Sequence, residues 1–89
     1  MQLRMFCVRD RATEVYGTPM FLVTTGQAVR SFSDEVNREA ADNQLYTHPD
    51  DFDLFLMGDW NNDSGEFVLC APECVCRAKD VSTKFNGVH

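Results

Sequence analysis

Three stretches of the chain are rich in apolar residues and have the length of β-strands, and in the first two the side chains form two alternating sets. The stretches are residues 3–9, 52–57 and 67–70. In the first two, both alternating sets contain apolar residues, as expected for strands that are covered on both faces. A further apolar run at residues 20–23 predicts a short extended segment. Residues 59–66 predict a hairpin connection in which Gly65 adopts a positive φ.

One amphipathic helix is predicted between these strands, over residues 25–39. Thr24 and Gln27 have the spacing of a capping box, in which the threonine hydroxyl accepts from an early backbone N–H and the glutamine reaches back. At 100° per residue, five apolar side chains fall within one arc and form a stripe that faces the core. These are Ala28, Val29, Phe32, Val36 and Ala40. The helix is expected to fray at residues 41–43, and residues 45–49 are expected to be a connector because Pro49 disfavours helix before it.

These elements predict an α+β fold in the order β-α-β-β. A small antiparallel sheet of three to four strands carries one long helix on one face. A short C-terminal element follows Cys70, either a helix opened by Pro72 or an extended segment through residues 74–76. We expect a single domain over residues 1–81 and a flexible tail over residues 82–89, which offers few core side chains.

A second apolar face of the sheet needs a cover. One helix covers one face only, whereas the strands also carry apolar residues that point the other way; we place Phe6, Val8, Phe55 and Met57 among them. This predicts a homodimer, formed face to face or by pairing of edge strands. The C-terminal segment is the competing cover.

Composition narrows the class of protein. The chain has 89 residues, is 44% hydrophobic and carries a formal net charge of −6, from 8 basic and 14 acidic residues. It is too apolar to be a disordered acidic tail, and it contains no run of about 18 apolar residues that would span a membrane. The first residues do not resemble a signal peptide, so we expect a cytoplasmic protein with reduced cysteines. The acidic balance argues against a generic phosphate-binding surface but allows a local basic patch.

Four segments carry a resemblance to a known family. They are residues 5–10 (MFCVRD), 29–37 (VRSFSDEVN), 46–55 (YTHPDDFDLF) and 56–65 (LMGDWNNDSG). In this order they resemble the small nonstructural protein of gokushoviruses, which are single-stranded-DNA phages of the Microviridae. The resemblance covers most of residues 1–70. The cysteine-rich segment from Cys70 onward departs from the family pattern.

The resemblance implies a nonstructural, DNA-binding protein. Such a protein would act in viral single-strand synthesis or packaging, in the cytoplasm of the bacterial host, by binding single-stranded DNA or a replication protein. It implies no catalytic residues.

Two segments contain side chains of the kinds that ligate metal ions. Cys70, Cys74 and Cys76 are suitable zinc ligands, but their spacing is irregular and a fourth ligand would have to be Cys7 or His89. We therefore expect no metal site, with Cys7 and Cys70 packed as small buried side chains; zinc or a redox disulfide is the alternative. Residues 59–63 begin like a calcium loop but lack the glycine and the glutamate that an EF-hand requires, so an acidic hairpin with local hydrogen bonds from Asp63 and Ser64 is favoured.

Enzymatic chemistry is not expected. His48 is followed by carboxylates and would serve as a general base, but no nucleophile at a recognisable spacing and no glycine-rich phosphate loop accompany it. A polar turn entering a strand explains it better. Neither catalytic residues nor a cofactor are predicted.

The basic residues decide how DNA would be bound. On the helix, Asp34 is spaced to pair with both Arg30 and Arg38, so the outer helix face is a poor phosphate platform. Candidate phosphate contacts are therefore the basic residues of the first strand and of the C-terminal segment: Arg4, Arg9, Arg11, Arg77, Lys79 and Lys84. Exposed aromatic rings stack unpaired bases; the candidates are Phe6, Tyr16, Tyr46 and Trp60. Ordinary surface cations paired with nearby acids are the alternative.

A second function follows from the acidic residues. Between residues 42 and 63 the chain has no Lys or Arg but six aspartates, namely Asp42, Asp50, Asp51, Asp53, Asp59 and Asp63. A surface of this kind would bind a basic viral or host protein without contacting DNA. The two functions are distinguished by whether the protein binds single strands at low salt.

Overall fold

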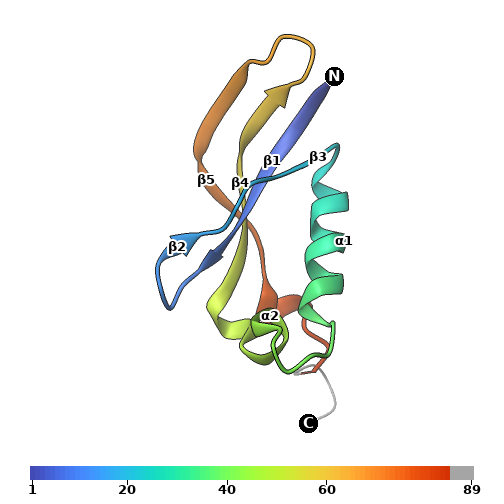
Figure 1. Ribbon diagram of the computed structural model, residues 1–89, viewed down its shortest axis with the longest axis vertical. Coiled ribbons are helices and arrows are strands. Elements are labelled where there is room, and N and C mark those ends of the chain that lie inside the picture. The colour runs from blue at the N-terminus through green and yellow to red at the C-terminus, as the bar shows by residue number, and fades with distance from the viewer. Residues whose placement is uncertain (85–89) are drawn as a thin grey trace.

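A twisted antiparallel sheet forms one layer of the molecule, and short helices form the other (Figure 1). The structure, a computed structural model, describes residues 1–84. The sheet contains β1 (Gln2–Asp10), β2 (Val15–Tyr16), β3 (Met20–Leu22), β4 (Phe52–Asn61) and β5 (Phe67–Arg77). The helices are α1 (Thr25–Val36), α2 (Gln44–Thr47), the 3-10 helix η1 (Pro49–Asp51) and α3 (Ala78–Val81).

The sheet has five strands in place of the three to four that we expected. The order is β2-β1-β4-β5, and β3 also pairs with β1, beside β2. The strand pairs are all antiparallel, which confirms the α+β class and the hairpin between the last two strands. The additional strand is β2, a two-residue segment that turns back onto the end of β1.

The predicted helix start is confirmed, whereas its predicted length is wrong. Thr24 Oγ1 accepts from the backbone N–H of Gln27 at 3.1 Å, and Gln27 Oε1 accepts in return from the backbone N–H of Val23. α1 ends at Val36, and the connector beyond it contains the separate short helices α2 and η1. The layer on the sheet is therefore built from several short helices and not from one long one.

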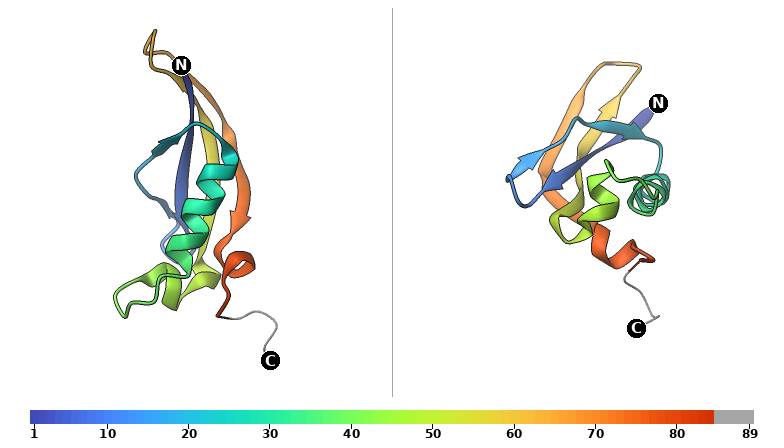
Figure 2. Two further views of the ribbon diagram at one scale, coloured as in Figure 1. Left: turned by 90° about the vertical axis from the view of Figure 1, so that its right-hand side faces the viewer. Right: turned by 60° about the horizontal axis from the view of Figure 1, so that its bottom comes forward.

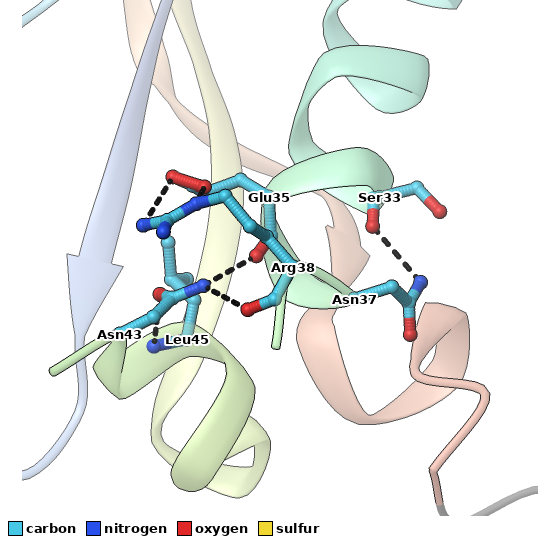
Figure 3. Close-up of polar contacts among 6 residues, drawn as sticks. All are labelled: Ser33, Glu35, Asn37, Arg38, Asn43 and Leu45. Atoms are coloured by element: carbon cyan, nitrogen blue, oxygen red, sulfur yellow. Dashed lines mark hydrogen bonds and ion pairs between the residues drawn. The ribbon is translucent and has the colours of Figure 1, made fainter. Parts of the chain in front are cut away.

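Two asparagines account for the early end of α1 (Figure 3). The last carbonyls of a helix have no partner inside the helix and need donors from elsewhere. The Asn37 side-chain amide donates to the Ser33 carbonyl at 2.9 Å, and the Asn43 amide donates to the carbonyls of Glu35 and Arg38, both at 2.8 Å. Because Arg38 lies beyond this end, it pairs with Glu35 and not with Asp34 as predicted.

The core lies between α1 and one face of the sheet. Its buried side chains come from β1, β4, α1 and α3: Phe6, Leu54, Leu56, Ala28, Phe32, Val36 and Ala78. The predicted helix stripe is thus confirmed at Ala28, Phe32 and Val36. Phe6 and Val8, which we placed on the second face of the sheet, belong to this core instead, because they lie opposite Leu56 and Leu54 in the ladder between β1 and β4.

Irregular pairing changes the direction of the sheet near Gly58. The register shifts between Met5 and Phe6 on β1 and between Leu56 and Gly58 on β4. Gly58 has a φ of +147°, and a Cβ atom there would lie 2.4 Å from the Val68 carbonyl oxygen. Glycine is therefore required at this position, where the β5 backbone lies close to β4.

The C-terminal segment packs on the helix side of the sheet. Its residues 71–77 continue β5, so the extended alternative was right, and α3 then joins the core through Ala78. In the expected tail, the Thr83 backbone N–H donates to Asn37 Oδ1 at 2.8 Å; residues 85–89 lie outside the described part. In residues 1–84 no helix is long and apolar enough to cross a membrane.

Candidate nucleic-acid interface on the open face of the sheet

The sheet face that points away from α1 carries the second apolar surface that the sequence predicted. Figure 2 shows α1, α2 and α3 gathered on one side of the strands. Opposite residues of an antiparallel ladder share a face, so the strand registers define the side chains on the other side. This open face includes Leu3, Met5, Cys7, Arg9, Tyr16, Phe21, Asp53, Phe55, Trp60, Phe67, Leu69, Cys74 and Arg77. No helix of the described chain covers it.

Three aromatic rings form a cluster at one end of the open face. The Phe21 and Trp60 ring centroids are 5.3 Å apart, and Trp60 stacks on Phe67 at 6.1 Å with an interplanar angle of 27°. The rings come from three different strands, β3, β4 and β5. Met5, which lies opposite Phe21 in the ladder between β1 and β3, is buried, while Phe21 and Phe67 remain exposed. Such a cluster offers flat apolar surface to a ligand that stacks.

Arginines gather at the other end of the same face. Arg9 and Arg77 lie on either side of Asp53 in the ladders from β1 to β4 and from β4 to β5. Arg11 joins them, because its Nε lies 3.3 Å from Asp53 Oδ2. The Asp53 side chain is only 6% exposed. Arg11 pairs with this carboxylate, and Arg9 and Arg77 are its neighbours in the ladders, which leaves a local surplus of positive charge on a protein that is acidic as a whole.

An aromatic pair links the arginines to the rest of the face. Tyr16 and Phe55 meet edge to face with centroids 5.6 Å apart, and the Arg9 guanidinium lies 5.6 Å from the Tyr16 ring centre. A cation held over a ring keeps its donors free for a further partner. The open face therefore runs from a cationic end, through this pair, to the aromatic cluster.

The remaining predicted basic residues do not join this group. Arg4 lies on the α1 side, where it donates to Thr25 Oγ1 at 2.7 Å and pairs with Asp59 at 3.5 Å. Lys79 is exposed on α3, away from the open face. Lys84 lies over the Tyr46 ring and donates to the Tyr46 carbonyl. The structure thus unites Arg9, Arg11 and Arg77 and separates the other three.

The aromatic candidates divide in the same way. Phe6 is completely buried in the core, so it is no stacking residue. Tyr46 is engaged with Lys84, whereas Tyr16 and Trp60 do lie on the open face. The sequence interpretation placed Phe55 on this surface without naming it as a stacking residue, and it missed Phe21 and Phe67. The alternation of residues 52–57 gave a signal for Phe55, but the position of Phe21 depends on β3 pairing with β1.

The cysteines are dispersed along β1 and β5. Cys7 is buried, as expected, and burial raises the pKa of its thiol. Cys70 is exposed, contrary to expectation, because β5 is the edge of the sheet. Burial, with a smaller contribution from Cys74, raises the pKa of Cys76 to about 11. Within residues 1–84 no three His, Cys, Asp or Glu side chains are grouped so as to hold a metal ion.

The six aspartates between residues 42 and 63 do not share one surface. Asp53 is buried beside Arg11, Asp59 pairs with Arg4, and Asp63 pairs with the Met1 amino group. In the hairpin turn, Asn61 Oδ1 accepts from the backbone N–H of Asp63, and Gly65 adopts the expected positive φ. His48 is exposed between α2 and η1, in a polar turn as predicted.

A comparison with known protein families finds a match over most of the chain. A family model described as Phage ORF5 protein matches residues 3–81, which is nearly the whole of the described structure. The chain belongs to the phage ORF5 protein family. The match covers both ends of the open face, including the Arg77 position and the aromatic cluster. No curated protein and no solved structure matches this ORF5 family chain.

Proposed function

We propose that this phage ORF5 family protein is a nonstructural accessory protein of a single-stranded-DNA phage and that it binds single-stranded DNA on its open face. The observation that carries the proposal is one exposed surface that combines stacked aromatic rings with a cluster of arginines. Proteins that bind single strands use this combination, because rings stack the bases and cations neutralise the phosphates. The gokushovirus resemblance supports a role in viral DNA replication or packaging in the bacterial host.

The roles of the two ends differ. Phe21, Trp60 and Phe67 are suited to bases, since each presents a ring at the surface. Arg9 and Arg77 are suited to phosphates, because they flank Asp53 while Arg11 pairs with it. Asp53 pairs with Arg11, which leaves the charges of its ladder neighbours Arg9 and Arg77 for phosphates. The overall charge of −6 keeps DNA from binding elsewhere and so restricts it to this face.

The test uses Trp60, the single tryptophan of the chain. Oligothymidylate is titrated into the protein at a low and a high salt concentration, and both tryptophan fluorescence and the anisotropy of labelled DNA are followed. Stacking of a base on Trp60 quenches its fluorescence, and phosphate contacts make the affinity fall steeply with salt. No binding at low salt would remove the proposal and leave the acidic protein–protein regulator as the function to pursue.

Matched variants locate the site. Arg9→Ala and Arg77→Ala should each reduce the slope of log affinity against log salt by about one, whereas Arg30→Ala, on the exposed side of α1, should leave it unchanged. Phe21→Leu removes a stacking ring and should weaken binding by roughly tenfold or more. Tyr46→Leu serves as its control, because Tyr46 lies on α2 beside Lys84. Equal effects of Arg9→Ala and Arg30→Ala would contradict a site on the open face.

A further inference from the structure

The outer edge of β5 has the features of a strand that pairs with another strand. β5 is the last strand of the sheet, so one of its two edges has no partner among residues 1–84. Phe67, Val68 and Leu69 are 55%, 64% and 70% exposed, and their side chains lie on both faces of the sheet. Proteins ordinarily protect such an edge with charges, a proline or a covering segment. Residues 67–71 contain neither a charge nor a proline, Pro72 comes only after them, and no segment of residues 1–84 covers them.

The hairpin geometry determines which backbone groups are free. The Asn61 N–H donates to the Glu66 carbonyl at 2.9 Å, so the polar groups of Glu66 point toward β4. Direction alternates along a strand of an antiparallel ladder. The N–H and C=O groups of Phe67 and Leu69 therefore point outward, and those of Val68 point to Asp59 on β4. Leu69 is the centre of the uncharged apolar run from 67 to 71.

We propose that two copies of this chain pair antiparallel through β5, with Leu69 opposite Leu69 on a two-fold axis. Phe67 then lies opposite the partner's Ala71, and Val68 lies opposite the partner's Cys70. The outward groups of Phe67 and Leu69 find partners in this register, whereas the missing N–H of Pro72 lies beyond the run. Apolar side chains meet apolar side chains on both faces, as an interface between identical surfaces requires.

Charge selects this register over its neighbour. Glu66 and Glu73 flank the apolar run. With the axis at Leu69, Glu66 lies opposite Pro72 and Glu73 lies opposite Gly65. With the axis moved to a point between Leu69 and Cys70, each Glu66 would face the partner's Glu73, and like charges directly opposite one another are destabilising. Of these two registers, the one centred on Leu69 is therefore the one that fits a second copy.

The first test is the mass in solution together with a proline variant. Light scattering at micromolar concentration should give twice 10.1 kDa for the unmodified chain. Leu69→Pro removes only an outward N–H, so the β4–β5 hairpin should persist by circular dichroism while the mass falls to that of a monomer. If the proline variant does not fold, Leu69→Lys takes its place. It puts two like charges on the axis, so the mass should again fall to that of a monomer. A monomeric unmodified chain would overturn the proposal.

The second test is the register, read by a disulfide. In a Cys74→Ser, Cys76→Ala background, V68C places a thiol directly opposite the partner's Cys70, in a non-hydrogen-bonded pair whose Cα atoms lie about 4.5 Å apart. Mild oxidation should convert this variant to a covalent dimer on a non-reducing gel. Adding Cys70→Ser should abolish the product, because the two V68C thiols do not face each other. A doubled mass without the crosslink would mean pairing through the open face and would overturn the edge pairing, whatever the result with DNA.

Discussion

Gly58 combines a positive φ with the closest backbone approach found at the described glycines. Replacing it by alanine brings Cβ to 2.4 Å from the Val68 carbonyl oxygen and 2.9 Å from the Leu69 Cα, and neither backbone atom moves without disturbing β5. We expect Gly58→Ala to lower the free energy of unfolding by roughly 3 kcal/mol or more, from strain and overlap together. Urea unfolding followed by circular dichroism measures it.

Two other glycines provide matched controls for this prediction. Gly65 has a φ of +79° but open space around its Cα, so alanine there should cost only about 1–2 kcal/mol of left-handed strain. Gly26 lies in α1 with no close contact, and alanine there should stabilise the helix by up to about 1 kcal/mol. If alanine at Gly58 lowers the free energy of unfolding no more than alanine at Gly65 does, the β5 backbone moves to make room for the added Cβ atom.

At the scale of elements, the boundary between α1 and α2 depends on Asn43. Its side chain is buried and makes three hydrogen bonds: its amide donates to the Glu35 and Arg38 carbonyls, and its oxygen accepts from the Leu45 N–H. Asn43→Ala removes the amide that donates to the Glu35 and Arg38 carbonyls and the oxygen that caps α2, so we expect a loss of about 2 kcal/mol in the free energy of unfolding. Thermal and urea unfolding of the variant check this value.

Asn43→Asp separates the two roles of this residue. Aspartate caps a helix as well as asparagine does, so it would restore stability if the cap of α2 at Leu45 were what matters. It has no amide to donate and places a carboxylate beside two carbonyl oxygens. We therefore expect Asn43→Asp to be no more stable than Asn43→Ala at neutral pH. Recovery with aspartate would assign the stabilisation to α2 alone.

Elements whose determinants are local were predictable from the sequence. The start of α1 depends on Thr24 and Gln27, three residues apart, and the hairpin turn depends on Gly65. The end of α1 was not predictable, because Asn43 reaches back eight residues to Glu35 and Asn37 bonds across 44 residues to the Val81 carbonyl. The length of β5 was underestimated because pairing with β4 extends it past Pro72.

The candidate site was predictable only in part for the same reason. Arg9, Arg11 and Arg77 were candidates by charge, but their position at one end of the open face depends on the registers of two ladders. Arg4 and Arg9 both lie on β1 but are separated by an odd number of positions, so their side chains point to opposite faces of the sheet. The register shift between Met5 and Phe6 does not change this alternation. The second apolar face was inferred correctly from the alternation; which side chains occupy it required the pairing of β1 with β4.

For the whole molecule, the two proposals predict one continuous platform. A two-fold axis perpendicular to the sheet at Leu69 places both open faces on the same side of a ten-stranded sheet, with the Phe67 rings of the two copies near the centre. The arginine ends lie at the far sides. A long single strand would then contact two sites at once, whereas a short one would occupy a single site.

Affinity should therefore depend on DNA length in a way that requires the dimer. An oligothymidylate of about eight nucleotides fits one open face and one of about thirty spans both. For the unmodified chain we expect the longer strand to bind more tightly by about tenfold or more, because the second contact is intramolecular. The Leu69→Pro monomer, whose charge is unchanged, should lose most of the additional affinity that the long strand has over the short one. Tryptophan fluorescence titrations of both proteins with both strands measure this difference. An equal gain in the monomer would show that the two faces act independently.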